Sequence, residues 1–276
     1  MVGRGSAVVA ATLVLAACGG GGGGSGGGGS PVGTTASQAG FVLPAANAGS
    51  TVIAQDGVNG GSAVVRYTSG GSASVSFGGK TTTWRGTPTT VGDVEVTESN
   101  DGRTVVVTAR SGAASSTALE YTSYGVWLES SASGVLSGTS GQVTSVSSFV
   151  IGDPTPVTAM PQSGTASYRG QAVAVELREG QLPRTLSGRL DATVDFGRNR
   201  LDATTDLATA SGAPFGTVTM SNVGIRGNEF SGTATGATHA GTVEGGFAGP
   251  GAAEIGGSFE LNGPSTVHGA FAGSSR

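Results

Sequence analysis

Apolar and polar residues alternate strictly from Leu186 to Phe196. The apolar or small side of this run consists of Leu186, Gly188, Leu190, Ala192, Val194 and Phe196. The positions between them are Ser187, Arg189, Asp191, Thr193 and Asp195. Because successive side chains of a strand point to opposite faces, this period of two predicts a β-strand with one buried and one wet face. A membrane-spanning barrel is apolar outside, so the charged wet face predicts a barrel that stands in water.

A Gly-x-Phe pattern occurs three times, beginning at Gly245, Gly257 and Gly269, with a spacing of twelve residues. Twelve residues suit one strand plus a tight turn, so the repeat predicts an antiparallel meander with turns at 249–251 and 262–264. Gly and Phe two positions apart lie on one face of a strand. The ring can therefore cover the gap above the glycine.

Further runs in the second half of the chain also read as strands. They lie at 164–169, 172–178, 200–205, 216–223 and 228–234. Together with 186–196 and the three Gly-x-Phe segments, they give eight or nine strands. This number suits a small closed barrel filled by its own side chains. We predict a soluble, eight-stranded antiparallel β-barrel over residues 156–276.

The first half is also rich in β-strand residues, with less regular alternation. Its candidate strands lie at 51–55, 62–68, 73–77, 80–84, 103–110, 117–128 and 142–151. A proline-bearing segment, Asp153–Pro156, follows them, and proline cannot continue a central strand. We therefore predict an all-β chain, with a β-rich N-terminal domain at 36–155 ahead of the barrel.

A short apolar run, from Ala7 to Ala17, precedes the only cysteine, Cys18. The run is too short to span a bilayer, which takes about 20 residues. It suits the apolar region of a secretory signal, with small residues before the cleavage site. We predict a lipoprotein signal peptide at 1–17 and lipidation of Cys18 by a diacylglycerol and an N-acyl chain such as palmitate, enough for stable anchoring. The alternative is an ordinary secretory signal with an incidental cysteine.

A tract of glycine and serine follows, from Gly19 to Ser30. Such sequence is a flexible coil with a root-mean-square reach of roughly 20 Å over its length. We assign 18–35 to a tether between the lipid and the folded body. Gly19 stands where an aspartate would favour retention in the inner membrane. The outer membrane is therefore the expected location.

Composition and histidine count argue against several functions. The chain has 14 basic and 18 acidic residues and no basic stripe, which excludes nucleic-acid binding. Its two histidines are His239, in a Gly/Thr-rich loop, and His268, on the expected outer barrel face. They lack the spacing of a metal site, although a two-histidine site is conceivable, and we expect neither to stand beside a plausible serine nucleophile. We expect no catalytic residues, no cofactor and no metal.

Two groups of side chains deserve an explanation as candidate sites. Asp191 and Asp195 share a strand face with Arg189 and can imitate paired carboxylates, but a solvated face explains them better. Tyr121, Tyr124 and Trp127 are typical of interface anchors, yet a spacing of three does not keep one strand face. We expect them to pack between the two domains, with at least one pointing to solvent.

Trp84 is the other aromatic candidate. It follows Lys80 and three threonines, so it can lie near a loop of the N-terminal domain. We name Trp84 as a candidate ligand anchor. Its replacement by alanine without loss of ligand binding would remove this assignment.

Motifs spread over residues 120–276 resemble the transferrin-binding protein B family of surface lipoproteins. They are Tyr124-Gly125-x-Trp127, Gly152-x-Pro154-x-Pro156, Pro161-x-Ser163-Gly164-x-Ala166-x-Tyr168-x-Gly170, Val194-Asp195-Phe196-Gly197, Phe230-Ser231-Gly232-Thr233-Ala234, Phe247-x-Gly249-Pro250-x-Ala252-x-Glu254-x-Gly256-Gly257-x-Phe259 and Gly269-x-Phe271. The resemblance implies a "handle" domain followed by an eight-stranded barrel on a lipid anchor. It also implies capture of host proteins such as transferrin, haemoglobin or complement regulators, with delivery of iron or haem to an outer-membrane transporter. We expect one handle and one barrel, in place of the two lobes of the transferrin receptor.

The sequence thus predicts a non-enzymatic, surface-exposed lipoprotein that binds a protein ligand for iron or haem acquisition. One alternative is a structural, adhesive or immune-evasion envelope lipoprotein without iron cargo. Another is a small-ligand carrier that uses the mouth of the barrel, as lipocalins do. The self-filling Gly/Phe pattern argues against the large cavity that a carrier needs.

Overall fold

The computed structural model describes residues 51–55, 64–67, 72–77, 80–85, 89–99, 102–109, 119–131 and 143–276. Up to residue 85 it describes the backbone of the strands. Cys18 and the Gly/Ser tract lie outside the described residues. The described secondary structure is strand apart from one 3-10 turn, Val157–Ala159, and contains no helix long and apolar enough to cross a membrane. The all-β prediction is confirmed.

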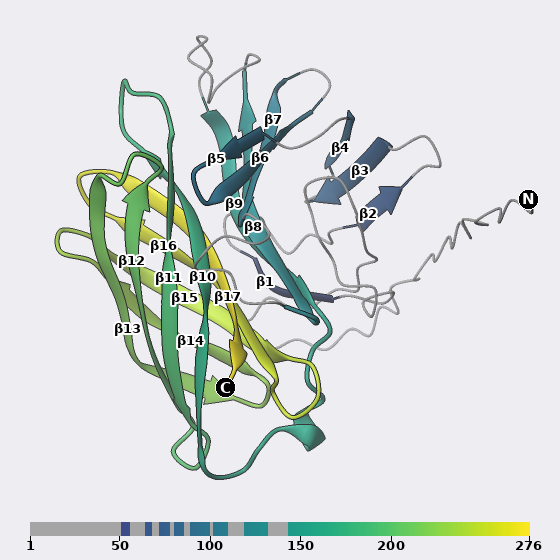
Figure 1. The fold of residues 1–276 in the computed structure, drawn as a ribbon, viewed down its shortest axis with the longest axis vertical. Coiled ribbons are helices and arrows are strands. Elements are labelled where there is room, and N and C mark those ends of the chain that lie inside the picture. Colours follow the sequence, from purple (N-terminus) through teal and green to yellow (C-terminus); the bar gives the residue numbers. More distant parts are fainter. Residues whose placement is uncertain are drawn as a thin grey trace, which may run out of the picture.

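Eight antiparallel strands form a closed barrel (Figure 1). They are β10 (Thr165–Leu177), β11 (Arg184–Asp195), β12 (Arg200–Thr209), β13 (Pro214–Arg226), β14 (Glu229–Thr235), β15 (Ala240–Ala248), β16 (Glu254–Asn262) and β17 (Thr266–Ser275). Each strand pairs with the next, and β10 pairs with β17 to close the barrel. The predicted eight-stranded barrel is confirmed.

The barrel corrects one predicted strand break. The segments expected at 164–169 and 172–178 are a single strand, β10, which runs through Gly170. A side chain at Gly170 would overlap the carbonyl oxygen of Ala272 on β17. Glycine is therefore needed here for the close approach of two backbones, and it does not interrupt the strand.

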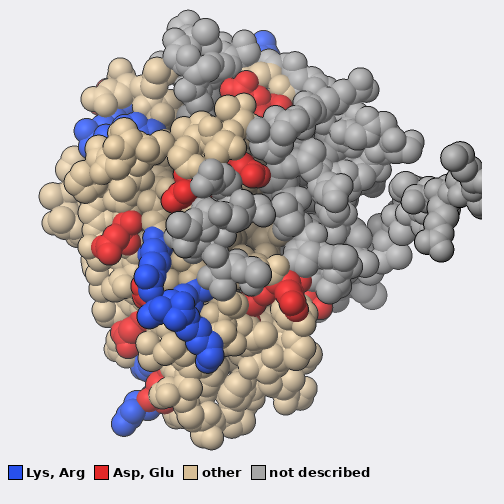
Figure 2. All heavy atoms as spheres, viewed as in Figure 1, with Lys and Arg blue, Asp and Glu red and all other residues tan. Residues whose placement is uncertain are grey.

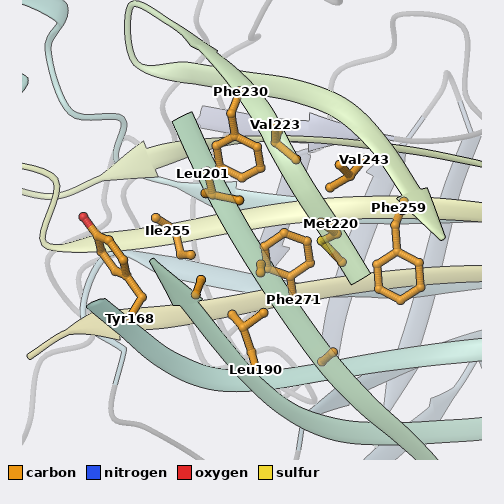
Figure 3. Packing of buried hydrophobic residues seen from close by; sticks show 14 of the residues in the cluster. Tyr168, Leu190, Leu201, Met220, Val223, Phe230, Val243, Ile255, Phe259 and Phe271 are labelled. Carbon is orange, nitrogen blue, oxygen red and sulfur yellow. The ribbon is translucent and has the colours of Figure 1, made fainter. Parts of the chain in front are cut away.

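Phenylalanine rings fill the barrel interior, where Figure 3 shows Phe230, Phe259 and Phe271. Phe259 lies directly across from Gly269, and Phe271 across from Gly257. A Cβ at either glycine would overlap the ring opposite. The expected aromatic cover is therefore present, but each ring covers a glycine on the neighbouring strand and not the one two positions before it. The rings lie 6.3–6.5 Å apart in nearly parallel pairs.

A six-stranded antiparallel sheet lies beside the barrel (Figure 1). Its order is β1 (Thr51–Gln55), β9 (Val143–Gly152), β8 (Thr122–Ser130), β7 (Thr104–Ala109), β6 (Val94–Glu98) and β5 (Thr89–Val91). The hairpin of β5 and β6 was not predicted. Its turn begins at Gly92, where φ is +62°, a conformation that favours glycine. A separate three-stranded sheet holds β2 (Val64–Tyr67), β3 (Ser72–Phe77) and β4 (Lys80–Arg85).

The six-stranded sheet packs on the outside of the barrel over β10 and β17. Val173 and Val175 of β10 and Ala270 and Ala272 of β17 point outward and are fully buried. They join a cluster with residues of the sheet, among them Val105, Val107, Val126, Leu128 and Val150. This part of the barrel wall is therefore apolar on both faces, whereas β11 and β12 alternate between buried and exposed positions.

Polar contacts fix the sheet to the barrel at one edge of this interface. The carboxylate of Glu254 on β16 accepts the backbone N–H groups of Glu120 and Tyr121. Burial raises the pKa of Glu254 despite these hydrogen bonds. The connecting segment is held as well, because the Thr155 hydroxyl donates to the carbonyl of Gly249 at 2.6 Å. Hydrogen bonds thus hold the segment just before β8 to the barrel, and they hold the segment between β9 and β10 to the barrel as well.

We expect Gly256→Ala to lower the free energy of unfolding by about 1–3 kcal/mol, the usual cost of overpacking. A Cβ at Gly256 would lie 2.6 Å from Val150 Cγ1 and 2.9 Å from Thr122 Cγ2 of the sheet. Chemical denaturation measures the change. Gly197→Ala is the control, because the nearest atom to its Cβ would be 3.4 Å away. Equal stability of the two variants would contradict the close packing at Gly256.

Candidate binding site at the loop end of the barrel

One end of the barrel carries four hairpin loops, which we call the loop end: residues 178–183, 210–213, 236–239 and 263–265. The antiparallel meander places every second connection at this end. The loop 178–183 is the longest of the barrel's hairpin connections. The loop end is therefore built from four separate segments that a strict meander brings together.

A fully buried carboxylate, Glu176, holds both ends of the loop 178–183. Glu176 is the next-to-last residue of β10 and its side chain is 0% exposed. Arg178 Nε lies 2.7 Å from Glu176 Oε1, and Arg184 Nε lies 2.7 Å from Oε2. The Nη2 group of Arg184 also contacts Oε2. Since Arg178 begins the loop and Arg184 follows it, one carboxylate joins its two ends.

The same carboxylate connects to two further loops. The Ser265 hydroxyl, in the loop 263–265, donates to Glu176 Oε1 at 2.8 Å. Ser265 Oγ lies 2.9 Å from Nε2 of His239, in the loop 236–239. The imidazole packs against Phe215, near the start of β13, with ring centroids 5.1 Å apart and the ring planes tilted by 49°. Glu176 therefore ties three loops of the loop end into one hydrogen-bonded unit.

The pKa of Glu176 results from opposing causes. Burial alone would raise it, but hydrogen bonds from Ser265, Arg178 and Arg184 outweigh burial and hold the pKa below its ordinary value of 4.5. Glu176 is therefore ionised at neutral pH. Its two guanidinium partners remain partly in water, with side chains 44% and 39% exposed.

The structure corrects the expectation that no serine stands beside a histidine. Ser265 and His239 are neighbours in space although 26 residues separate them. The arrangement is nevertheless unsuited to a serine nucleophile. A carboxylate only accepts hydrogen bonds, so the Ser265 proton points at Glu176 and Nε2 of His239 must donate to Ser265 Oγ. The Ser265 side chain is also buried.

The loop 178–183 carries an exposed leucine. Leu182 is 46% exposed, and the other large exposed hydrophobic residues among those described are Val91 and Val157. Val157 lies at the opposite end of the barrel. Leu182 thus stands in the longest barrel loop, between two half-exposed arginines.

The predicted aromatic candidates lie on different faces of the six-stranded sheet and, for Trp84, in a different sheet. Tyr124 packs between sheet and barrel, and a Cβ at Gly249 of the barrel would overlap the Tyr121 ring. Trp127 lies on the other face of the sheet, where it is 3% exposed. The expectation that one of the three points to solvent is wrong, because the far face of β8 is buried too. Trp84 lies in β4 opposite Ala73, and nothing described tests its role as an anchor.

The remaining candidates lie on the barrel wall. His268 is on the outer face as expected. It lies on β17, over which the sheet packs, and is only 7% exposed. Asp191 pairs with Arg169 and Arg189, and Asp195 with Arg198. Figure 2 shows basic and acidic side chains interspersed over the barrel wall. The two aspartates thus belong to a solvated face, and the described residues hold no cluster of potential metal ligands.

The barrel matches a known family. Residues 160–275 match the family described as the C-lobe and N-lobe beta barrels of Tf-binding protein B. No curated protein matches the chain. The comparison with a family thus rests on the barrel.

One solved structure shares the fold over more of the chain than the barrel alone. HpuA from Kingella denitrificans, in complex with human haemoglobin, is 18% identical with a TM-score of 0.50, over 89% of this chain and 94% of that chain. It shares the fold. A mutant of transferrin-binding protein B from Haemophilus parasuis is 26% identical with a TM-score of 0.47, over 76% of this chain and 42% of that one. The protein from Neisseria meningitidis is 22% identical with a TM-score of 0.45, over 68% and 36%.

The chain spans about two fifths of the length of the first transferrin-binding protein B structures it matches. The barrel, in contrast, is matched over its whole extent. Residues 160–275 thus match the barrels of transferrin-binding protein B, in agreement with the resemblance that the sequence motifs of this region indicate.

Proposed function

We propose that this protein is a non-enzymatic lipoprotein, anchored in the outer membrane through Cys18 and displayed at the cell surface, that binds a host iron- or haem-carrier protein. The observation that carries the proposal is the similarity to HpuA, whose structure is known in complex with human haemoglobin. The similarity covers nearly all of both chains. The match of the barrel to the transferrin-binding protein B family supports it. Both comparisons point to recognition of a protein.

The interior of the barrel supports a protein ligand over a small one. Tyr168, Phe247, Phe259 and Phe271 are among its largest fully buried side chains. They fill the space that a lipocalin-like carrier would leave for its ligand. Contact through the outside, at loops, is the mode that remains for the described part of the chain.

The proposed organisation follows the predicted one. It has a signal peptide at 1–17, a tether at 18–35, a handle at 36–155 and the barrel at 156–276. The end of β9 at Gly152 and the start of β10 at Thr165 support a boundary between them. The handle would then contain the six-stranded sheet.

Binding and growth test the proposal together. The full-length protein in detergent is expected to bind immobilised human haemoglobin or human transferrin. A deletion strain should grow poorly when that protein is the only iron source. Cys18→Ala is the matched variant, expected to bind in solution yet fail to restore growth because it lacks the anchor. Absence of binding to both proteins, with unchanged growth of the deletion strain, would leave the structural or adhesive envelope role.

A further inference from the structure

We propose that the outer wall of the barrel carries a site for a neutral saccharide, in a hollow that crosses strands β10 to β13. This wall hollow has a volume of about 380 Å³, within the range of small-ligand sites. The outward-facing residues that line it are Ser167, Arg169, Asp191, Thr193, Asp202, Thr204, Thr219 and Ser221. The inference does not depend on the proposed function, because it involves neither the loop end nor a carrier protein.

The strand register explains why the wall is hollow here. Asp191, Thr204 and Thr219 lie directly across from one another on β11, β12 and β13. Arg169 continues this row on β10. The residues that alternate with them, such as Ala203, point into the barrel and are buried. Short threonine side chains in the middle of the row thus leave room above the backbone, beside the longer Arg169.

A β-bulge shapes the far edge of the wall hollow. The register between β12 and β13 shifts at Leu201–Ala203, and Asn222 has a φ of +55°. Bulges of this kind often re-aim side chains next to functional sites. The backbone N–H of Asn222 donates to Asp202 Oδ1 at 2.7 Å. One oxygen of Asp202 is therefore fixed, and the other has no partner among the described residues.

The free polar groups of the wall hollow are mostly hydroxyls. Within the described part of the chain, the hydroxyls of Thr193, Thr204 and Ser221 form no hydrogen bond with another protein group. A hydroxyl both donates and accepts, whereas the carboxylate of Asp202 only accepts. A ligand that satisfies both kinds of group carries many hydroxyls of its own. A sugar has this chemistry.

The charges of the wall hollow favour a ligand without negative charge. Asp191 pairs with Arg169 at 2.8 Å and with Arg189 at 2.9 Å, so its charge and theirs are already matched. Asp202 has no cationic partner among the described residues. The hollow thus has a surplus of one carboxylate, which disfavours phosphates and acidic sugars.

Two other ligand classes lack the groups that they need. The described residues hold no cluster of potential metal ligands. The large apolar residues at the wall hollow, Tyr168 and Met220, point into the barrel and are buried. A lipid would therefore find no apolar surface. Recognition rests on hydrogen bonds and not on stacking against a ring.

A printed array of mammalian glycans and bacterial lipopolysaccharide oligosaccharides tests the site. The probe is the full-length protein in a detergent without a sugar head group. The wild type is expected to bind neutral saccharides. Thr204→Met fills the middle of the hollow and removes a hydroxyl, so binding should weaken about 10-fold or more. Thr242→Met is the matched control, because Thr242 is exposed on β15 outside the hollow, and it should bind like the wild type.

Asp202→Asn tests the free carboxylate oxygen. The affinity should fall about 10-fold, because a hydrogen bond to a charged acceptor is lost. Asp206→Asn is its control, on the same strand but outside the wall hollow. Thermal melts check that each variant is folded.

Two outcomes would overturn the saccharide site. They are absence of binding across the whole array, and equal binding by the wild type and Thr204→Met. Binding confined to the bacterial oligosaccharides would support the site and identify the sugars of a bacterial surface as its ligand. Binding confined to the mammalian glycans would support it with host sugars as the ligand. In every case the haemoglobin and transferrin experiments decide the proposed function separately.

Discussion

Phe259→Ala is expected to lower the free energy of unfolding by about 3–5 kcal/mol. Phe259 is 1% exposed inside the barrel and packs against Phe271 with centroids 6.5 Å apart. Its removal leaves a cavity above Gly269, which has no side chain to fill it. For a protein of this size the melting temperature should fall by roughly 6–20 °C. Thermal and chemical unfolding of the purified protein measure both quantities.

A double-mutant cycle shows whether the pairing of ring and glycine is the cause. Gly269→Ala alone should cost about 1–3 kcal/mol, since the three nearest atoms to its Cβ all belong to the Phe259 ring. With Phe259→Ala the ring is gone and the methyl group occupies part of the cavity. The double variant should therefore be more stable than the sum of the single losses predicts. Strict additivity would show that ring and glycine act independently.

Glu176→Gln is expected to lower the free energy of unfolding by about 3 kcal/mol. The substitution keeps the shape but removes the charge that holds Arg178 and Arg184, and it replaces one accepting oxygen with an amide N–H donor that faces other donors. The melting temperature should fall by roughly 6–12 °C. Asp191→Asn is the matched control. Asp191 also faces two arginines, but its side chain is 47% exposed, and a pair of this kind contributes about 1 kcal/mol or less.

The pH dependence of the same variant follows from the lowered pKa of Glu176. A carboxyl with a pKa lower in the folded than in the unfolded state stabilises the fold above its ordinary pKa of 4.5. That contribution is lost as the pH falls through the folded-state pKa. The gap in stability between wild type and Glu176→Gln should thus be full at pH 7 and close in acid. A gap that stays constant down to pH 2 would contradict the role of the charge.

The barrel could be predicted because its chemistry is local. The alternation at 186–196 and the Gly-x-Phe repeat record which face of each strand is buried, and the structure follows them. The prediction errors arise at glycines, because a glycine in a sequence can mark the end of a strand, a close approach of two backbones or a tight turn. Gly170 reads as a break but permits two strands to approach, and Gly92 opens the short β5–β6 hairpin, whose three-residue strand β5 is exposed throughout.

The loop end could not be predicted, because its parts are far apart in the sequence. Glu176 and Ser265 are 89 residues apart, and only closure of the barrel makes them neighbours. The signal that was available is the acid between Val175 and Leu177, an ionisable residue at an inward position of an apolar strand. Such a residue needs partners, and the arginines at 178 and 184 were the nearest candidates. Trp127 was misplaced for a similar reason, since sequence alone does not show that a second face is covered.

The position of the six-stranded sheet has a consequence for the order of assembly. The sheet packs across the seam between β10 and β17, the one barrel pairing that joins strands distant in sequence. Its strands are made first, yet half of the surface on which they pack, Ala270 and Ala272, belongs to the barrel strand made last. The sheet therefore cannot complete its packing on the barrel until β17 has paired with β10. Once packed, the sheet holds β10 and β17 together. The barrel cannot open between these strands without also losing their contacts with the valines of the sheet.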